Sequence, residues 1–333
     1  MSKIGILGTG TWGIALARTL TNAGHEVTAW SPHSTAELAA ARRHKNLPDM
    51  VIPDATCFTD SIEEVCTGKE LLLMAVASVY VRSVTAQAAP FIRPGQIIVD
   101  AAKGIEEGTL LTMTEVIHSE LAKAGKAEGV SLVAFSGPTH AEEVSRDLPT
   151  TVVAAGEDPA AMEKVQEIFL NTCMRVYTNT DVRGVELCGA VKNIVALASG
   201  ISTGLGYGDN TKAALVTRGM EEIKRLGLAM GCREKTFFGL AGIGDLVVTT
   251  TSRHSRNNRC GELIGQGYSV EDAVKEVGMV VEGINALPAA MELSGRYGVE
   301  MPITEAVYNI IFRGTSPQDA VIGLMARDMK AES

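Results

Sequence analysis

The chain has 333 residues, of which 46% are hydrophobic and 21% charged, so it is not a disordered protein and is long enough for two domains with separate cores. Its formal net charge of −9 argues against a general binder of nucleic acid or anionic membranes. Any phosphate that it binds must therefore be held by a local basic patch. Six cysteines without a Cys-x-x-Cys pair favour reduced thiols, with no metal site and no disulfide framework.

The start of the chain has the pattern of a dinucleotide-binding unit. Lys3–Leu7 is a short apolar run typical of a strand, and Gly8-Thr9-Gly10-Thr11-Trp12-Gly13 follows it directly. A helical pattern begins at Ile14, and His25–Trp30 predicts the next strand. In such a unit the glycines permit a tight turn and a close backbone approach to a pyrophosphate. An ordinary glycine-rich turn is the alternative, and the flanking strands favour the dinucleotide site.

The end of the second predicted strand bears on the choice of cofactor. An NAD site usually places an acidic residue there, to bind the ribose hydroxyls. The chain has Trp30-Ser31-Pro32-His33 instead, without an acid and without the arginine common at NADP sites. Ser31 or His33 could bind a 2′-phosphate. The pattern favours NADP slightly and leaves NAD open.

Further strands are predicted at the rhythm of an alternating α/β fold, at Leu71–Val76, Gln96–Val99, Val130–Phe135, Thr150–Ala154 and Arg175–Tyr177. Because ligands of parallel sheets gather at the carboxyl ends of the strands, the polar loops there are candidate binding segments. These loops contain Ser78, Lys103-Gly-Ile-Glu106 and Ser136-Gly-Pro-Thr-His140. Lys103 is either a cofactor-edge residue or a solvated loop lysine.

No further strands are predicted after Tyr177, which places a domain boundary near Asp181. We expect a dinucleotide-binding domain over residues 1–180 and a mostly helical second domain over 181–333. Helical patterns in the second domain cover Val182–Ile201, Thr211–Ala229, Glu271–Val277, Asn285–Arg296, Glu305–Phe312 and Pro317–Met325.

One helical stretch, Gly184–Gly206, is apolar or small almost all round, which is typical of a buried helix. Lys192 lies within it, and its neighbours at helical spacing carry no charge. The side chain either extends its ammonium to water or is held desolvated as a general acid/base.

Two polar segments of the second domain are predicted as loops. Gly239-Leu-Ala-Gly-Ile-Gly-Asp245 is rich in glycine and ends on an aspartate. The segment 249–259 is rich in hydroxyls and contains Arg253, Arg256 and Arg259. It is either a solvated loop or a local anion site suited to a phosphate.

These motifs together resemble bacterial-type NAD(P)-dependent glycerol-3-phosphate dehydrogenases along nearly the whole chain. The resemblance rests on their order and spacing, in 8–17, 103–106, 136–144, 184–193, 239–245, 255–257 and 280–283. It implies a Rossmann-like domain followed by a helical domain similar to that of 6-phosphogluconate dehydrogenase. It also implies hydride transfer between NADPH or NADH and dihydroxyacetone phosphate, which forms sn-glycerol 3-phosphate for phospholipid synthesis.

The resemblance also implies roles for single residues. Lys192 would be the catalytic acid/base, and the family's substrate positions match Lys103, Gly137, Thr139, Lys192, Asp245, Ser255, Arg256 and Asn257. Its cofactor positions match Gly8, Gly10, Thr11, Trp12, Gly13, His33, Lys103, Ala141, Arg256, Val280 and Glu282. Ala77 and Thr139-His140 depart from common family residues without removing a group that the chemistry needs.

Two rival functions remain open from the sequence. A related two-domain reductase could act on another small substrate, although the Ser255-Arg-Asn257 segment favours a phosphorylated one. A non-catalytic sensor of the nicotinamide nucleotides would keep the glycine-rich turn and would not need Lys192, Asp245 and Arg256 together. Without a signal peptide, and with a longest apolar run (Leu71–Ala77) too short to cross a bilayer, we expect a cytoplasmic protein with no stable membrane insertion. A homodimer is expected from the apolar character of the helical domain.

Overall fold

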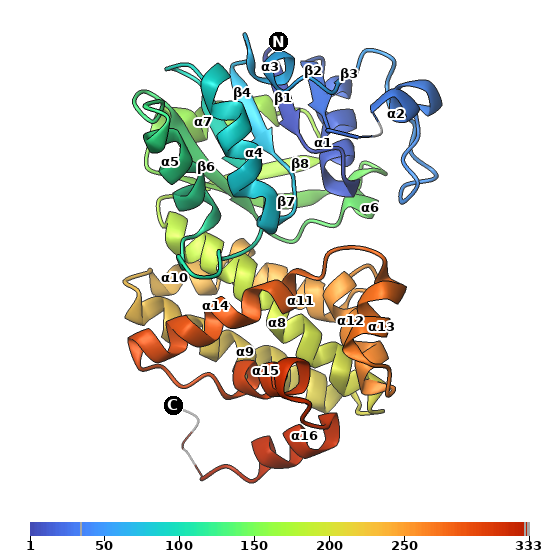
Figure 1. Cartoon of the computed structure of the whole chain (residues 1–333), viewed down its shortest axis with the longest axis vertical. Helices are drawn as coiled ribbons and strands as arrows, with labels where there is room; N and C mark the ends of the chain where they lie inside the picture. Colours follow the sequence, from blue (N-terminus) through green and yellow to red (C-terminus); the bar gives the residue numbers. More distant parts are fainter. Residues whose placement is uncertain (34, 330, 332–333) are drawn as a thin grey trace. The chain divides into compact units, whose positions relative to one another are not determined.

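The computed structural model describes residues 1–33, 35–329 and 331. The chain divides into two compact units, which are described separately (Figure 1). The first comprises residues 1–106 and 111–186, and the second comprises residues 107–110 and 187–333. The division thus falls inside the first turns of a long helix, whereas the sequence places it just before that helix.

The first unit contains one sheet in the strand order β3-β2-β1-β4-β5-β6-β7-β8. The strands are β1 (Lys3–Leu7), β2 (Glu26–Trp30), β3 (Cys57–Thr59), β4 (Leu71–Met74), β5 (Ile97–Asp100), β6 (Ser131–Ser136), β7 (Thr150–Gly156) and β8 (Met174–Asn179). The predicted strands are confirmed to within a few residues. The sequence did not predict β3, which is only three residues long, or the antiparallel pairing of β6 with β7.

Helices cover both faces of this sheet, as expected for a Rossmann-like unit. They are α1 (Thr11–Asn22), α2 (Thr35–Ala41), α3 (Ile62–Cys66), α4 (Val81–Ala88), α5 (Met113–Lys123), α6 (Ala141–Val144) and α7 (Pro159–Ile168). One core cluster joins apolar residues of the sheet to α1 and α7, and a second joins the sheet to α3, α4 and α5. Since β1 pairs with β2 on one side and β4 on the other, the strand order reverses beside the glycine-rich turn.

The second unit is helical, as predicted. Its helices are α8 (Val182–Gly204), α9 (Asp209–Ala229), α10 (Glu234–Phe237), α11 (Asp245–Thr251), α12 (Arg256–Gly265), α13 (Val270–Val277), α14 (Glu282–Tyr297), α15 (Pro302–Arg313) and α16 (Pro317–Met325). The prediction that two segments of this unit are loops is wrong. Leu240–Gly244 forms a π-helical turn that leads into α11, and most of 249–259 belongs to α11 and α12.

α8 is the central helix of the second unit, and the prediction of a buried helix is confirmed. Every residue from Gly184 to Ser202 is buried. A Cβ on Gly200 would stand 2.0 Å from the Asn258 carbonyl oxygen, and one on Gly261 would stand 2.1 Å from that of Leu197. Glycines on both helices therefore allow α8 and α12 to pack backbone against backbone. Among the described residues α8 alone is long and apolar enough to span a membrane, and its most apolar window is entirely buried in the fold.

Candidate active site

The glycine-rich turn lies between the end of β1 and the first turn of α1. Gly8 has φ +119°, and a Cβ on Gly13 would stand 2.1 Å from the Gly8 carbonyl oxygen. Both positions therefore require glycine for the turn itself. Gly10 is different, because a Cβ there would meet no atom within 4 Å.

Gly10 thus borders open space at the N-terminus of α1, where Thr11, Trp12 and Gly13 form the first turn. The N–H groups of a first helical turn have no partner within the helix, and the helix dipole favours an anion beside them. A glycine that faces open space and leads into such a turn fits the pyrophosphate of a dinucleotide.

Three predicted substrate residues of the first unit lie in contact at the ends of β5 and β6. The Lys103 ammonium donates to the Gly137 carbonyl oxygen at 3.1 Å and to Thr139 Oγ1 at 3.4 Å. Thr139 in turn donates to the same carbonyl oxygen. Lys103 is therefore held over the loop that follows β6 and is partly buried, and Ala141 begins the short helix α6 directly after this loop.

The segment that follows α2 lies against the glycine-rich turn, which the sequence did not indicate. Asn46 donates to Thr11 Oγ1 at 3.1 Å. His44 is buried and bonds the backbone of Thr9, while its burial and the nearby Lys45 hold the pKa of its imidazole below the usual range. The polar run Arg42-Arg-His-Lys-Asn46 has no periodic pattern and gave no signal for this contact. His33, the residue proposed for a 2′-phosphate, is exposed at the end of β2.

In the second unit Lys192 is buried, with 4% of its surface exposed, so the alternative of a lysine that extends to water is wrong. Its ammonium donates to Thr249 Oγ1 at 2.7 Å and to Asn193 Oδ1 at 3.2 Å. Asp245 Oδ1 is 3.2 Å from the same nitrogen, and its side chain is 2% exposed. The lysine thus has one buried carboxylate and two neutral oxygens around it.

Helix α11 explains why Asp245 and Thr249 both reach Lys192. They are four residues apart on one helix and therefore lie on the same face. Thr249 Oγ1 also bonds the Asp245 backbone oxygen at 2.6 Å, which fixes the hydroxyl in place. Thr249 was not predicted as a partner of Lys192 because its segment was interpreted as a loop. In a loop, residues four positions apart do not share a face.

A chain of amide groups connects Lys192 to the predicted phosphate-binding residues. Asn193 Oδ1 accepts from Asn257 Nδ2 at 3.0 Å, and Asn257 Oδ1 accepts from the Gly283 N–H at 2.9 Å. Gly283 directly follows Glu282, the first residue of α14. Hydrogen bonds therefore connect the predicted residue Asn257 to the buried lysine. They also reach the start of α14, where the predicted residue Glu282 lies.

Ser255, Arg256 and Asn257 form the start of α12, not a loop. Ser255 caps this helix by accepting from the Asn258 N–H, and exposed Arg256 donates to the Val280 carbonyl oxygen at 3.4 Å. Arginine and a helix N-terminus both favour an anion. Arg259, three residues further along α12, lies near Glu276, with 3.4 Å between Nη2 and the carboxylate.

These features define a class of protein, the nicotinamide-dinucleotide-dependent dehydrogenases that combine a Rossmann-like unit with a helical unit carrying a buried lysine. Two family models match the chain. The N-terminal domain of NAD-dependent glycerol-3-phosphate dehydrogenase matches residues 3–162, and the C-terminal domain matches residues 181–322. The chain belongs to this family, and it is an oxidoreductase that uses NAD or NADP.

Individual relatives agree with the family. The chain is 62% identical to glycerol-3-phosphate dehydrogenase [NAD(P)+] 2 of Lactobacillus delbrueckii subsp. bulgaricus, over 100% of this chain and 99% of that protein. It is 46% identical to the enzyme of Bacillus subtilis, over 98% of this chain and 95% of that protein. The crystal structure of glycerol-3-phosphate dehydrogenase from Coxiella burnetii is similar with a TM-score of 0.92 and 36% identity, covering 98% of this chain and 99% of that one.

Proposed function

We propose that Lys192 is the general acid/base with which this oxidoreductase interconverts dihydroxyacetone phosphate and sn-glycerol 3-phosphate, forming the latter for phospholipid synthesis. The observation that carries the proposal is the burial of the Lys192 ammonium beside a single carboxylate. A lysine placed only to solubilise a helix would reach water, and a lysine that served only packing would not need three oxygen partners.

Reduction of the ketone requires a hydride on carbon and a proton on oxygen. Bound NADPH or NADH supplies the hydride. The Lys192 ammonium stabilises the negative charge that develops on the substrate oxygen and then donates its proton there. In the reverse direction the neutral amine takes the hydroxyl proton. Asp245, Thr249 and Asn193 hold the nitrogen in a fixed position, so little reorganisation is needed when the charge develops.

Other residues are proposed to bind the substrate. Ser255, Arg256 and Asn257 offer a hydroxyl, a guanidinium and an amide at the N-terminus of α12, which suits a phosphate. Lys103, Gly137 and Thr139 form the polar cluster of the first unit that the resemblance assigns to the substrate. Asp245 is proposed to orient substrate hydroxyls as well as Lys192.

The remaining residues are proposed to bind the cofactor. The turn from Gly8 to Gly13 would hold the pyrophosphate, and the resemblance adds His33, Lys103, Ala141, Arg256, Val280 and Glu282. Support for the turn comes from the open space beside Gly10. The absence of an acidic residue after β2 supports use of NADP alongside NAD.

The test follows the absorbance of NADPH and NADH when dihydroxyacetone phosphate is added, with a non-phosphorylated ketone for comparison. In Lys192→Ala we expect turnover to fall by at least about a thousandfold, while NADPH still binds. Lys275→Ala, at an exposed lysine of α13, is the matched control and should keep normal turnover. Near-normal turnover of Lys192→Ala would contradict the proposed role, and NADPH binding without any turnover in the unmodified protein would favour the sensor.

A cytoplasmic location, the lack of membrane insertion and a homodimer stay predictions. The complete burial of the most apolar window of α8 supports the second of these. Sedimentation of the purified protein would test the homodimer.

A further inference from the structure

A cavity of about 340 Å³ lies within the second unit, among α8, α9, α15 and α16. Most of its wall is aliphatic and includes Ile201, Leu215, Val307, Ile310, Val321 and Leu324. None of the residues proposed above for catalysis, substrate or cofactor lines it. Its volume lies in the range of pockets that hold small molecules.

The wall contributed by α16 is only loosely attached. None of the residues of α16 is fully buried, and Ile322 and Met325 are 65% and 82% exposed. A helix that buries so little of its own surface contributes little to stability and can adjust to an occupant. The cavity is therefore accessible from solvent and apolar inside.

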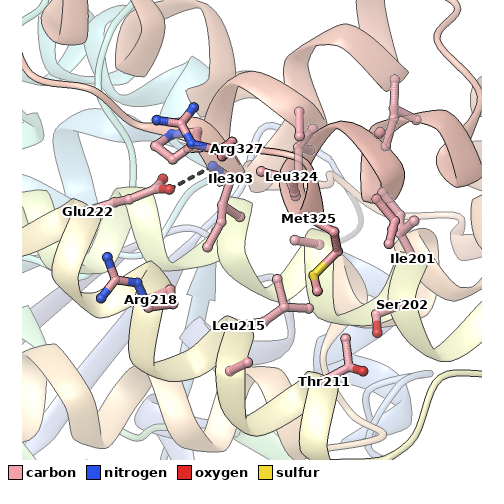
Figure 2. Close-up of a pocket in the computed structure, with 18 of the residues that line it drawn as sticks. Ile201, Ser202, Thr211, Leu215, Arg218, Glu222, Ile303, Leu324, Met325 and Arg327 are labelled. Atoms are coloured by element: carbon pink, nitrogen blue, oxygen red, sulfur yellow. Dashed lines mark hydrogen bonds between the residues drawn. The ribbon is translucent and has the colours of Figure 1, made fainter. Parts of the chain in front are cut away.

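The polar groups of the cavity lie mainly on one side. In the view of Figure 2, Arg218, Glu222 and Arg327 lie on one side of the space, and Ile201, Ser202 and Met325 lie on the other. The cavity thus has a charged end and an apolar end. Such a distribution matches an amphipathic molecule and not a uniformly apolar one.

Two carboxylates line the cavity, Glu222 and Asp328, and Asp328 is exposed to solvent whereas Glu222 is buried and has partners in the fold. The Glu222 carboxylate accepts from the backbone N–H groups of Ile303 at 2.6 Å and Thr304 at 3.2 Å, and from Thr304 Oγ1 at 3.1 Å. It therefore caps the N-terminus of α15, where the helix dipole also stabilises it. Glu222 is not available to neutralise a cation in the cavity.

The positive charge includes one arginine, Arg218, that is exposed to solvent and lines the cavity. Arg218 has no ion pair or hydrogen bond to any part of the chain that the structure describes. Arg225, about two turns further along α9, donates from Nη2 to the Glu300 carbonyl oxygen at 2.9 Å. Its Nε is buried and has no acceptor among the described residues.

We propose that this cavity binds an amphipathic monoanion, an unbranched aliphatic carboxylate of medium chain length. The hydrocarbon chain lies against the aliphatic wall, and the carboxylate lies at the charged end, where Arg218 supplies the charge. The site is separate from the proposed active site, so its occupation does not depend on Lys192.

The test measures binding of decanoate to the full-length protein by calorimetry, below the micelle concentration of decanoate and with saturating NADPH present. We expect one decanoate per chain, and weak or no binding of butyrate and of decyltrimethylammonium. Arg218→Ala should weaken binding of decanoate at least fivefold, while Arg296→Ala, at an exposed arginine of α14, should not change it. Lys192→Ala should also bind decanoate normally.

Val321→Trp fills the cavity from the loosely packed helix and should abolish binding without unfolding the protein, which its thermal transition would report. Equal binding of decyltrimethylammonium, or unchanged binding by Arg218→Ala or by a folded Val321→Trp, would overturn the proposal. Absence of decanoate binding would do the same, and a change of oligomeric state in Val321→Trp would then identify a second copy of the chain as the occupant.

Discussion

Two glycines of the turn after β1 should respond differently to replacement by alanine. Gly13→Ala should lower the stability of the protein, and Gly10→Ala should lower its affinity for NADPH. In Gly13→Ala the new Cβ would stand 2.1 Å from the Gly8 carbonyl oxygen and 3.3 Å from the Ala75 Cβ. A carbon and an oxygen need more than about 3 Å, so the turn must move by about 1 Å at a position where backbone faces backbone. Overpacking of this kind is unfavourable by about 1–3 kcal/mol.

In Gly10→Ala the new Cβ meets nothing within 4 Å, and the φ of −67° and ψ of 177° are accessible to alanine. The stability of the protein should therefore fall by less than about 1 kcal/mol, the usual difference between glycine and alanine at an N-cap. The methyl group would occupy the space through which a pyrophosphate approaches the backbone. We expect the dissociation constant for NADPH to rise at least tenfold, which corresponds to about 1.4 kcal/mol.

The two effects are measured separately, stability by thermal unfolding without cofactor and affinity by calorimetric titration with NADPH. Gly13→Ala should unfold at least about 2 °C lower, since about 1 kcal/mol shifts the midpoint by 2–4 °C in domains of this size. Gly295→Ala, inside α14 and also with open space for a Cβ, is the control and should change neither quantity unfavourably. If Gly10→Ala bound NADPH normally, or if Gly10→Ala were as unstable as Gly13→Ala, the assignment of the pyrophosphate to this turn would be wrong.

Three further results are expected. Glu222→Ala should lower the free energy of unfolding by about 2–4 kcal/mol in urea titrations, because it leaves the buried donors at the start of α15 without an acceptor, and a loss below about 0.5 kcal/mol would contradict this. Lys192→Met should destabilise the protein by about 3–5 kcal/mol because it removes the cation beside the buried Asp245 carboxylate, and adding Asp245→Asn should restore most of the stability and none of the turnover. At pH 8 iodoacetamide should label exposed Cys57 in the folded protein and spare Cys66, since burial raises the pKa of the Cys66 thiol to about 12; peptide mass spectrometry would show it.

Much of the first unit could be predicted because its strands are continuous apolar runs with turn residues between them. β4 is the clearest case, with four buried residues in succession. β3 could not be predicted, since a strand of three residues is too short to show a pattern of its own and forms only because β2 offers an edge. The antiparallel direction of β7 likewise follows from the tertiary path of the chain and not from its composition.

The same contrast applies to the second unit. α11 and α12 contain glycine, threonine and asparagine, whose low helix propensity favours a loop when the segment is considered alone. Their helical state comes from packing on α8, where Gly200 and Gly261 allow backbone contact. In these two helices, contacts between residues that are far apart in the sequence outweigh the local helix propensity.

The buried pair of Lys192 and Asp245 shows why local rules fail where chemistry is expected. Removing two charges from water is unfavourable, and an apolar pair of the same volume would stabilise α8 and α11 at least as well. Asp245 reduces this penalty because it lies at the N-terminus of α11, where the dipole favours a carboxylate. The lysine has no such support from α8, because it lies in the middle of the helix and not at the C-terminus, where the dipole would favour a cation. Its position is therefore better explained by a reaction that needs a desolvated proton donor than by stability, since proteins keep such locally unfavourable residues mainly at functional sites.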